Sequence, residues 1–126
     1  MKAIDVVRSA LGFADQGIRF IAEMKDNPCA QPGSYGGNHA MWIAGHVTVA
    51  EGRLHKMLFG VPNPVEHWKP LFDWGSQPTS DPSAYPPFEE VVRTFRALRA
   101  KTLAFLEEIG DEGLDQPTKK QPPGLE

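Results

Sequence analysis

The side chains of this sequence that could bind a metal or act in acid–base chemistry are few: His39, His46, His55, His67 and a single cysteine, Cys29. His39 and His46 are seven residues apart, which places them on one face of a helix almost two turns from each other. Their separation along the axis is then about 10 Å, whereas two imidazoles on one metal usually come from residues nearer one turn apart. The pair alone therefore predicts no metal site.

The remaining candidates show no pattern typical of a site. His55 falls on the opposite side of its predicted helix from His46, and His67 lies in a proline-rich segment, so we expect both on the surface. Cys29 follows Pro28 in a loop, with no neighbouring base or helix N-terminus to activate it, so it should be a thiol at neutral pH. Packing explains the large aromatic residues better than ligand stacking does; they are Trp42, Trp68, Phe72 and Trp74.

The composition indicates one globular domain. The 126 residues are 40% hydrophobic and 23% charged, and the formal net charge is −3. This charge argues against a nucleic acid or a membrane surface as partner, and three arginines are expected to form a solvated helix face: Arg93, Arg96 and Arg99. With one cysteine and no apolar signal segment, we expect a cytoplasmic protein.

Three helices must position any site, because three stretches show the 3.6-residue apolar period of a helix with one buried face. The first is predicted over residues 3–26 and ends at Asn27 and Pro28. Its buried face is expected to be broad, since four large residues widen the stripe: Val6, Phe13, Phe20 and Met24.

The second helix is predicted over residues 39–59, with Asn38 as its N-cap and Gly60 as its C-cap. Two internal glycines, Gly45 and Gly52, each lower helix propensity by roughly 1 kcal/mol relative to alanine. We therefore expect this helix to depend on tertiary packing.

The third helix is predicted over residues 88–109 and ends at Gly110, with Phe95 on its buried face and Arg93 on its exposed face. Residues 111–126 are expected to form a turn and an irregular tail.

A proline-rich connection joins the second and third helices. Residues 61–87 hold seven prolines, which exclude a long helix, together with five large apolar or aromatic residues: Trp68, Leu71, Phe72, Trp74 and Tyr85. Long connections with this content usually pack over the fold, so we predict an ordered segment rather than a flexible linker.

The segment from Asn38 to Glu51, NHAMWIAGHVTVAE, resembles the second helix of the DinB-like family, in which a tryptophan is followed by a histidine and then by an acidic residue. Other parts of the sequence resemble the family in the same order: residues 58–60, 71–76, 87–91 and 113–115. The resemblance spans nearly the whole chain and implies an all-α, up-and-down helical bundle. Taken as a single domain over residues 1–126, the chain is expected to show three helices and to stop before the fourth.

The resemblance also implies a possible metal site, because many members hold a divalent metal with three histidines. One comes from the second helix and two from a His-x-x-x-His pair on the last helix. The resemblance assigns the first ligand to His46, which should point toward the bundle interior. No His-x-x-x-His pair occurs in this sequence, so the other two ligands are expected beyond Glu126, and nickel or zinc should bind this chain weakly or not at all.

Two functions stay open. One is a metal-dependent enzyme of the DinB-like type, a transferase or isomerase that acts with a low-molecular-weight thiol. The other is a non-catalytic helical module that forms a homodimer through its apolar face, because burial of exposed apolar surface favours association.

Overall fold

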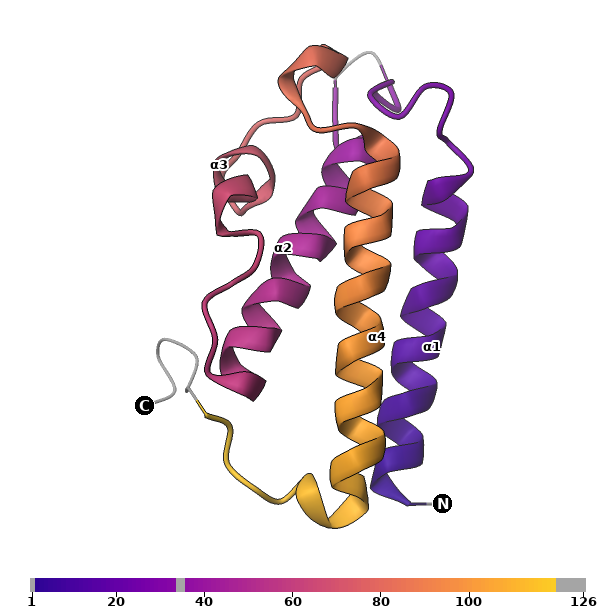
Figure 1. The fold of residues 1–126 in the computed structure, drawn as a ribbon. Coiled ribbons are helices and arrows are strands. Elements are labelled where there is room, and N and C mark those ends of the chain that lie inside the picture. Colours follow the sequence, from indigo (N-terminus) through magenta and orange to yellow (C-terminus); the bar gives the residue numbers. More distant parts are fainter. Residues whose placement is uncertain (1, 34–35, 120–126) are drawn as a thin grey trace.

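The computed structural model describes residues 2–33 and 36–119 and shows a bundle of three long helices (Figure 1). These are α1 (Ala3–Ala22), α2 (Ala40–Phe59) and α4 (Phe88–Gly113). The described residues form no strand beyond an isolated bridge between Gly33 and Gly36. None of their helices has a stretch long and apolar enough to cross a membrane. The all-α helical fold is therefore confirmed.

Helix α4 provides the centre of the core and packs most extensively against α2, with α1 along its other side (Figure 1). Phe95 is 3% exposed and Arg93 is exposed, as the apolar period of this helix predicts. The buried cluster combines residues of all three long helices; besides Phe95 it includes Ile18, Met41, Trp42, Val49, Val91 and Leu98.

The helix ends differ slightly from the prediction. Helix α1 ends at Ala22, and residues 23–26 form turns. The N-cap of α2 is His39 rather than Asn38, because the imidazole Nδ1 of His39 accepts a hydrogen bond from the backbone N–H of Trp42 at 3.0 Å. An imidazole can therefore satisfy a free N–H group of the first turn in place of the usual short polar side chain.

Helix α4 continues to Gly113, but its helical geometry is interrupted at Gly110, where φ is 62° and ψ is −166°. The left-handed φ favours glycine at this position. Gly110 therefore interrupts the helix where the sequence predicts its end, and a further turn follows up to Gly113. Of the predicted tail, residues 120–126 lie outside the described residues.

The prediction of one broad buried face on α1 is wrong. Only Ile4 and Ile18 are buried in this helix. The side chains that should have widened its stripe are exposed, at 55% for Val6, 84% for Phe13, 65% for Phe20 and 56% for Met24. The reason is that α1 packs against the bundle along a narrow stripe, and no other described segment covers its outer side.

The connection between α2 and α4 is ordered, as predicted, and folds over α2 (Figure 1). It contains η1 (Glu66–Trp68), α3 (Lys69–Phe72) and η2 (Pro82–Ala84). Trp68 and Phe72 are buried, whereas Trp74 is 78% exposed, so the expectation that Trp74 packs inside is wrong.

The internal glycines of α2 explain how the connection approaches so closely. A Cβ atom at Gly45 would overlap the ring of Phe72, and one at Gly52 would overlap the side chain of Asn63. Asn63 in turn donates a hydrogen bond to the carbonyl oxygen of Val49 at 3.2 Å. The glycines therefore lower the propensity of α2 but create the surface on which the connection packs.

Candidate functional site around His46

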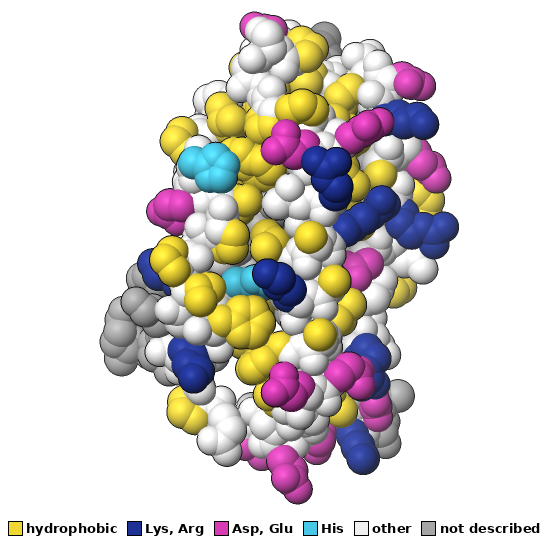
Figure 2. Space-filling view, viewed as in Figure 1, with side chains coloured by type: hydrophobic (Ala, Val, Ile, Leu, Met, Phe, Trp, Pro, Cys, Tyr) yellow, Lys and Arg dark blue, Asp and Glu magenta, His cyan; other side chains and the backbone are white. Residues whose placement is uncertain are grey.

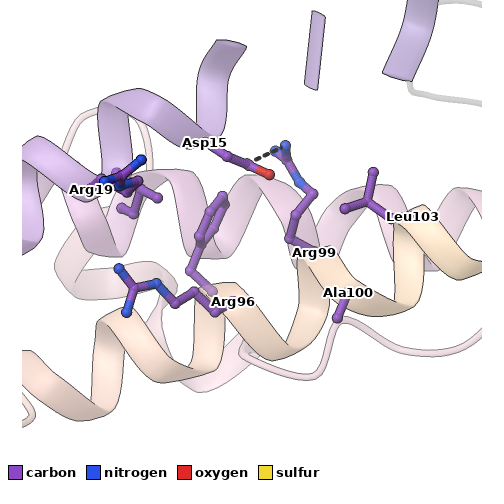
Figure 3. Close-up of a pocket in the computed structure, with 8 residues that line it drawn as sticks. Asp15, Arg19, Arg96, Arg99, Ala100 and Leu103 are labelled. Atoms are coloured by element: carbon purple, nitrogen blue, oxygen red, sulfur yellow. Dashed lines mark hydrogen bonds and ion pairs between the residues drawn. The ribbon is translucent and has the colours of Figure 1, made fainter. Parts of the chain in front are cut away.

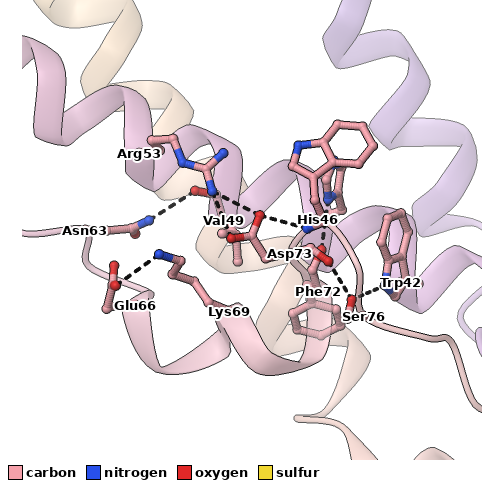
Figure 4. A network of polar contacts seen from close by, with 11 residues as sticks. Trp42, His46, Val49, Arg53, Asn63, Glu66, Lys69, Phe72, Asp73 and Ser76 are labelled. Carbon is pink, nitrogen blue, oxygen red and sulfur yellow. Dashed lines mark hydrogen bonds and ion pairs between the residues drawn. The ribbon is translucent and has the colours of Figure 1, made fainter. Parts of the chain in front are cut away.

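His46 lies half-buried on α2 and faces the connection between α2 and α4 (Figure 4). Its ring stacks on Trp42, with centroids 4.6 Å apart, and meets the ring of Trp74 edge-on at 4.7 Å. Its Nδ1 atom is 2.8 Å from the carbonyl oxygen of Phe72. Because a carbonyl oxygen only accepts hydrogen bonds, Nδ1 carries the proton of this contact, and Nε2 is the ring nitrogen that could bind a metal.

The segment that supplies this carbonyl is itself tied to α2 (Figure 4). One guanidinium nitrogen of Arg53 lies 3.0 Å from each carboxylate oxygen of Asp73. The indole N–H of Trp42 donates to Ser76 Oγ at 2.8 Å, and this hydroxyl donates to the carbonyl oxygen of Asp73 at 2.7 Å. These contacts position the Phe72 carbonyl beside His46.

The carboxylate of Asp73 belongs to this clamp. Burial raises the pKa of Asp73, but hydrogen bonds from the backbone N–H of Trp74 and from Arg53 outweigh burial, so the pKa lies below the ordinary value of 3.8. Asp73 is therefore anionic at neutral pH and paired with Arg53, and among the described residues no carboxylate forms a hydrogen bond with His46.

A divalent metal would need more ligands than this site offers. In the part of the chain that the structure describes, no three His, Cys, Asp or Glu side chains are grouped closely enough to hold an ion. Both ring nitrogens of His39 are engaged, one as the cap of α2 and the other with the carbonyl oxygen of Thr79 at 2.7 Å. His67 is exposed, as predicted. The described residues supply one candidate ligand, His46, and do not by themselves fit a metal site.

The sequence profile of the DinB superfamily matches residues 18–126. The chain belongs to this superfamily. The resemblance carried by Trp42, His46 and Glu51 is thus confirmed at the level of the family. Neither the curated proteins nor the solved structures contain a significant match to the chain.

The expectation that His55 lies on the surface of this DinB domain is wrong. His55 is 2% exposed, and its Nε2 atom lies 2.8 Å from the carbonyl oxygen of Leu98 and 3.0 Å from Thr102 Oγ1. The connection covers one side of α2 and α4 covers the other. A histidine opposite His46 is therefore also buried.

His55 begins a chain of buried polar contacts across the bundle. Thr102 Oγ1 donates to Glu51 at 2.6 Å, and Arg99 binds both Glu51 at 3.1 Å and Asp15 at 2.7 Å. The Arg99 side chain is 11% exposed, so its expected place on a solvated face is wrong, whereas Arg93 and Arg96 are exposed, as predicted. These polar side chains join all three long helices of the DinB domain.

The remaining candidate, Cys29, is 3% exposed. Burial raises the pKa of its thiol, and the nearby charge of Asp81 acts in the same direction. The thiol therefore stays protonated at neutral pH, and the sequence-based interpretation of an unactivated cysteine is confirmed.

Proposed function

We propose that this DinB-superfamily domain acts as a helical module that pairs with a second copy through the outer face of α1. The observation that carries this proposal is a row of exposed small and apolar residues with alternating spacings of four and three. This row, the α1 seam, consists of Val6, Ala10, Phe13, Gly17, Phe20 and Met24. Such spacing is typical of helices that pack along each other.

The α1 seam is complementary to itself when two copies run antiparallel. A two-fold axis near the middle of the helix places each large side chain opposite a smaller or flexible one. The facing pairs are Phe13 with Gly17, Phe20 with Ala10, and Val6 with Met24. A shallow hollow beside Phe13 and Phe20, lined also by Gly12, Gln16 and Gly17, supplies the recess that a ring of the second copy would enter.

The size of the α1 seam matches a reversible association. A phenylalanine or valine contributes about 1.5–3 kcal/mol when it is fully buried, and two copies together offer six such side chains. Association costs about 4–15 kcal/mol in lost freedom of motion, so the net free energy is modest. We expect a dimer that dissociates on dilution.

Sedimentation equilibrium over a range of concentrations tests this proposal. The unchanged chain should form dimers, while Phe13→Glu and Phe20→Glu should be monomers with the same helical circular dichroism. Ala97→Glu adds the same charge at an exposed site on α4 and should leave the dimer intact. A monomeric unchanged chain at the highest concentration, or seam variants that still dimerise, would contradict the proposal.

A second function rests on His46. We propose that Nε2 of His46 serves as one ligand of nickel or zinc in an enzyme that acts with a low-molecular-weight thiol, the other ligands coming from outside the described residues. Two observations support this: the chain belongs to the DinB superfamily, and the Phe72 carbonyl orients the ring through Nδ1, as backbone carbonyls often do for histidines that bind a metal through their other nitrogen. A metal there would stabilise a bound thiolate at an open position.

Calorimetric titration with nickel and with zinc tests the second function. Binding to the 126-residue chain should be weak, and it should disappear in His46→Ala. His67→Ala removes an exposed histidine and should leave the binding unchanged. Tight binding that survives the loss of His46 would contradict the assignment.

A further inference from the structure

A groove between α1 and α4 combines an apolar floor with a positively charged rim (Figure 3). Its hollow measures about 420 Å³. Ile18 and Phe95, at 5% and 3% exposure, form the floor. Three arginines line the same hollow: Arg19 of α1, and Arg96 and Arg99 of α4.

Two of these arginines are available to a ligand. Arg99 turns toward Asp15, which it binds at 2.7 Å, and it also binds Glu51, so its charge is already balanced (Figure 3). Arg19 and Arg96 are exposed and make no hydrogen bond or ion pair with any other described residue. Asp15 is the one acidic side chain among the described residues that line this hollow, and it is paired with Arg99 rather than with Arg19 or Arg96.

The positive charge continues along the groove. An adjoining hollow of about 260 Å³ shares Arg96 and is lined by Lys25 and Arg93, with Glu89 as its one acidic residue. Figure 2 shows several Lys and Arg side chains on the upper part of the face where α4 and α1 meet, with Asp and Glu side chains among them. The whole chain carries a net charge of −3, so this grouping of cations is local.

We propose that this groove binds a small organic anion, with a phosphate or carboxylate head group on Arg19 and Arg96 and an apolar body over Ile18 and Phe95. Planar guanidinium groups bind the oxygens of both head groups through paired hydrogen bonds. The hollow has the size of a small-molecule pocket, which is about 300–1,000 Å³.

Calorimetric titration at low salt tests the chemical class, with phenyl phosphate and phenylacetate as the two anionic probes. Each combines a negative head group with an apolar ring and should bind. Inorganic phosphate lacks the ring and benzyl alcohol lacks the charge, so both should bind more weakly. If neither anionic probe binds at millimolar concentration, the proposal is overturned, and the same holds if the chain binds only phosphatidylserine vesicles.

Variants locate the site. Arg19→Gln and Arg96→Gln should each weaken phenyl phosphate binding about ten-fold or more, as expected for the loss of a hydrogen bond to a charged group. Lys101→Gln removes an exposed cation of α4 that lies outside both hollows and should leave the affinity unchanged. Phenyl phosphate binding that is equal in both arginine variants and in the unchanged chain would overturn the assignment.

Discussion

The imidazole of His46 is oriented by the backbone of Phe72, since Nδ1 lies 2.8 Å from that carbonyl oxygen. The ring of the same Phe72 is fully buried against Gly45, one residue before His46 on α2. The position of the candidate ligand therefore depends on how closely the connection packs on this helix.

Gly45→Ala should destabilise the domain by about 1–3 kcal/mol, because the added methyl group would overlap the Phe72 ring in a packed core. Gly12→Ala is the matched control within α1. No atom outside the helix's own backbone lies near its position, so the higher helix propensity of alanine should stabilise the domain by about 0.5–1 kcal/mol. Urea unfolding midpoints measure both effects, and shifts of the same sign would contradict this account.

A second pair of matched variants tests the buried polar contacts between α2 and α4. Thr102→Val should destabilise the domain by about 1–3 kcal/mol. It removes the hydroxyl group that donates a hydrogen bond to Glu51 and accepts one from Nε2 of His55, so both buried side chains lose a hydrogen-bond partner. Thr94→Val removes a hydroxyl whose hydrogen bond is to the carbonyl oxygen of Glu90 in the same helix, and it should change the unfolding free energy little. Equal changes in unfolding free energy for the two variants would show that the buried polar contacts of Thr102 add no stability.

The lowered pKa of Asp73 predicts a pH dependence of stability. The unfolded carboxyl has a pKa near 3.8 and the folded one lies below it, so the stabilising contribution is complete above 3.8 and disappears as the pH falls through the folded value. Asp73→Asn should therefore lose less stability than the unchanged chain between pH 5 and the acid limit. Some pH dependence should remain, because the pKa values of Asp5 and Asp81 are lowered as well. Identical pH profiles of the two chains would refute this prediction.

The sequence predicts the faces of the three long helices unequally. In α4 one side meets the core and the other meets water, so its period places Phe95 and Arg93 correctly. Helix α2 is covered on two sides, by α4 and by the connection, and one apolar stripe cannot describe two buried faces. The period of α2 therefore predicts an exposed His55, whereas α4 buries it.

The candidate site around His46 was predictable only in its central residue. The group that orients His46 is a backbone carbonyl, which has no side-chain pattern in the sequence. The sequence did not predict the exposure of the α1 seam, for a different reason. An apolar period indicates that a face avoids water, but it does not distinguish burial within one chain from burial against another.

A single engineered cysteine tests the antiparallel arrangement of the α1 seam. In this pairing, the position of Gln16 on one copy lies beside the same position on the other, near the two-fold axis, so Gln16→Cys should form a disulfide-linked dimer under mild oxidation. Ser9 lies two turns away and would face Glu23 of the second copy. The two Ser9 positions are then separated by about 20 Å along the axis, so Ser9→Cys should stay unlinked.

Both variants keep the native Cys29. Because Cys29 is buried in the core, it should affect the two linking experiments equally. A parallel pairing would place neither position against itself, and would therefore leave both variants unlinked. Rapid linking of Ser9→Cys, or no linking of Gln16→Cys at concentrations where the unchanged chain sediments as a dimer, would show that the copies do not meet in the antiparallel register. The sedimentation result and the linking result are separate, so a dimer that forms without the Gln16→Cys link would refute this geometry while leaving association through α1 in place.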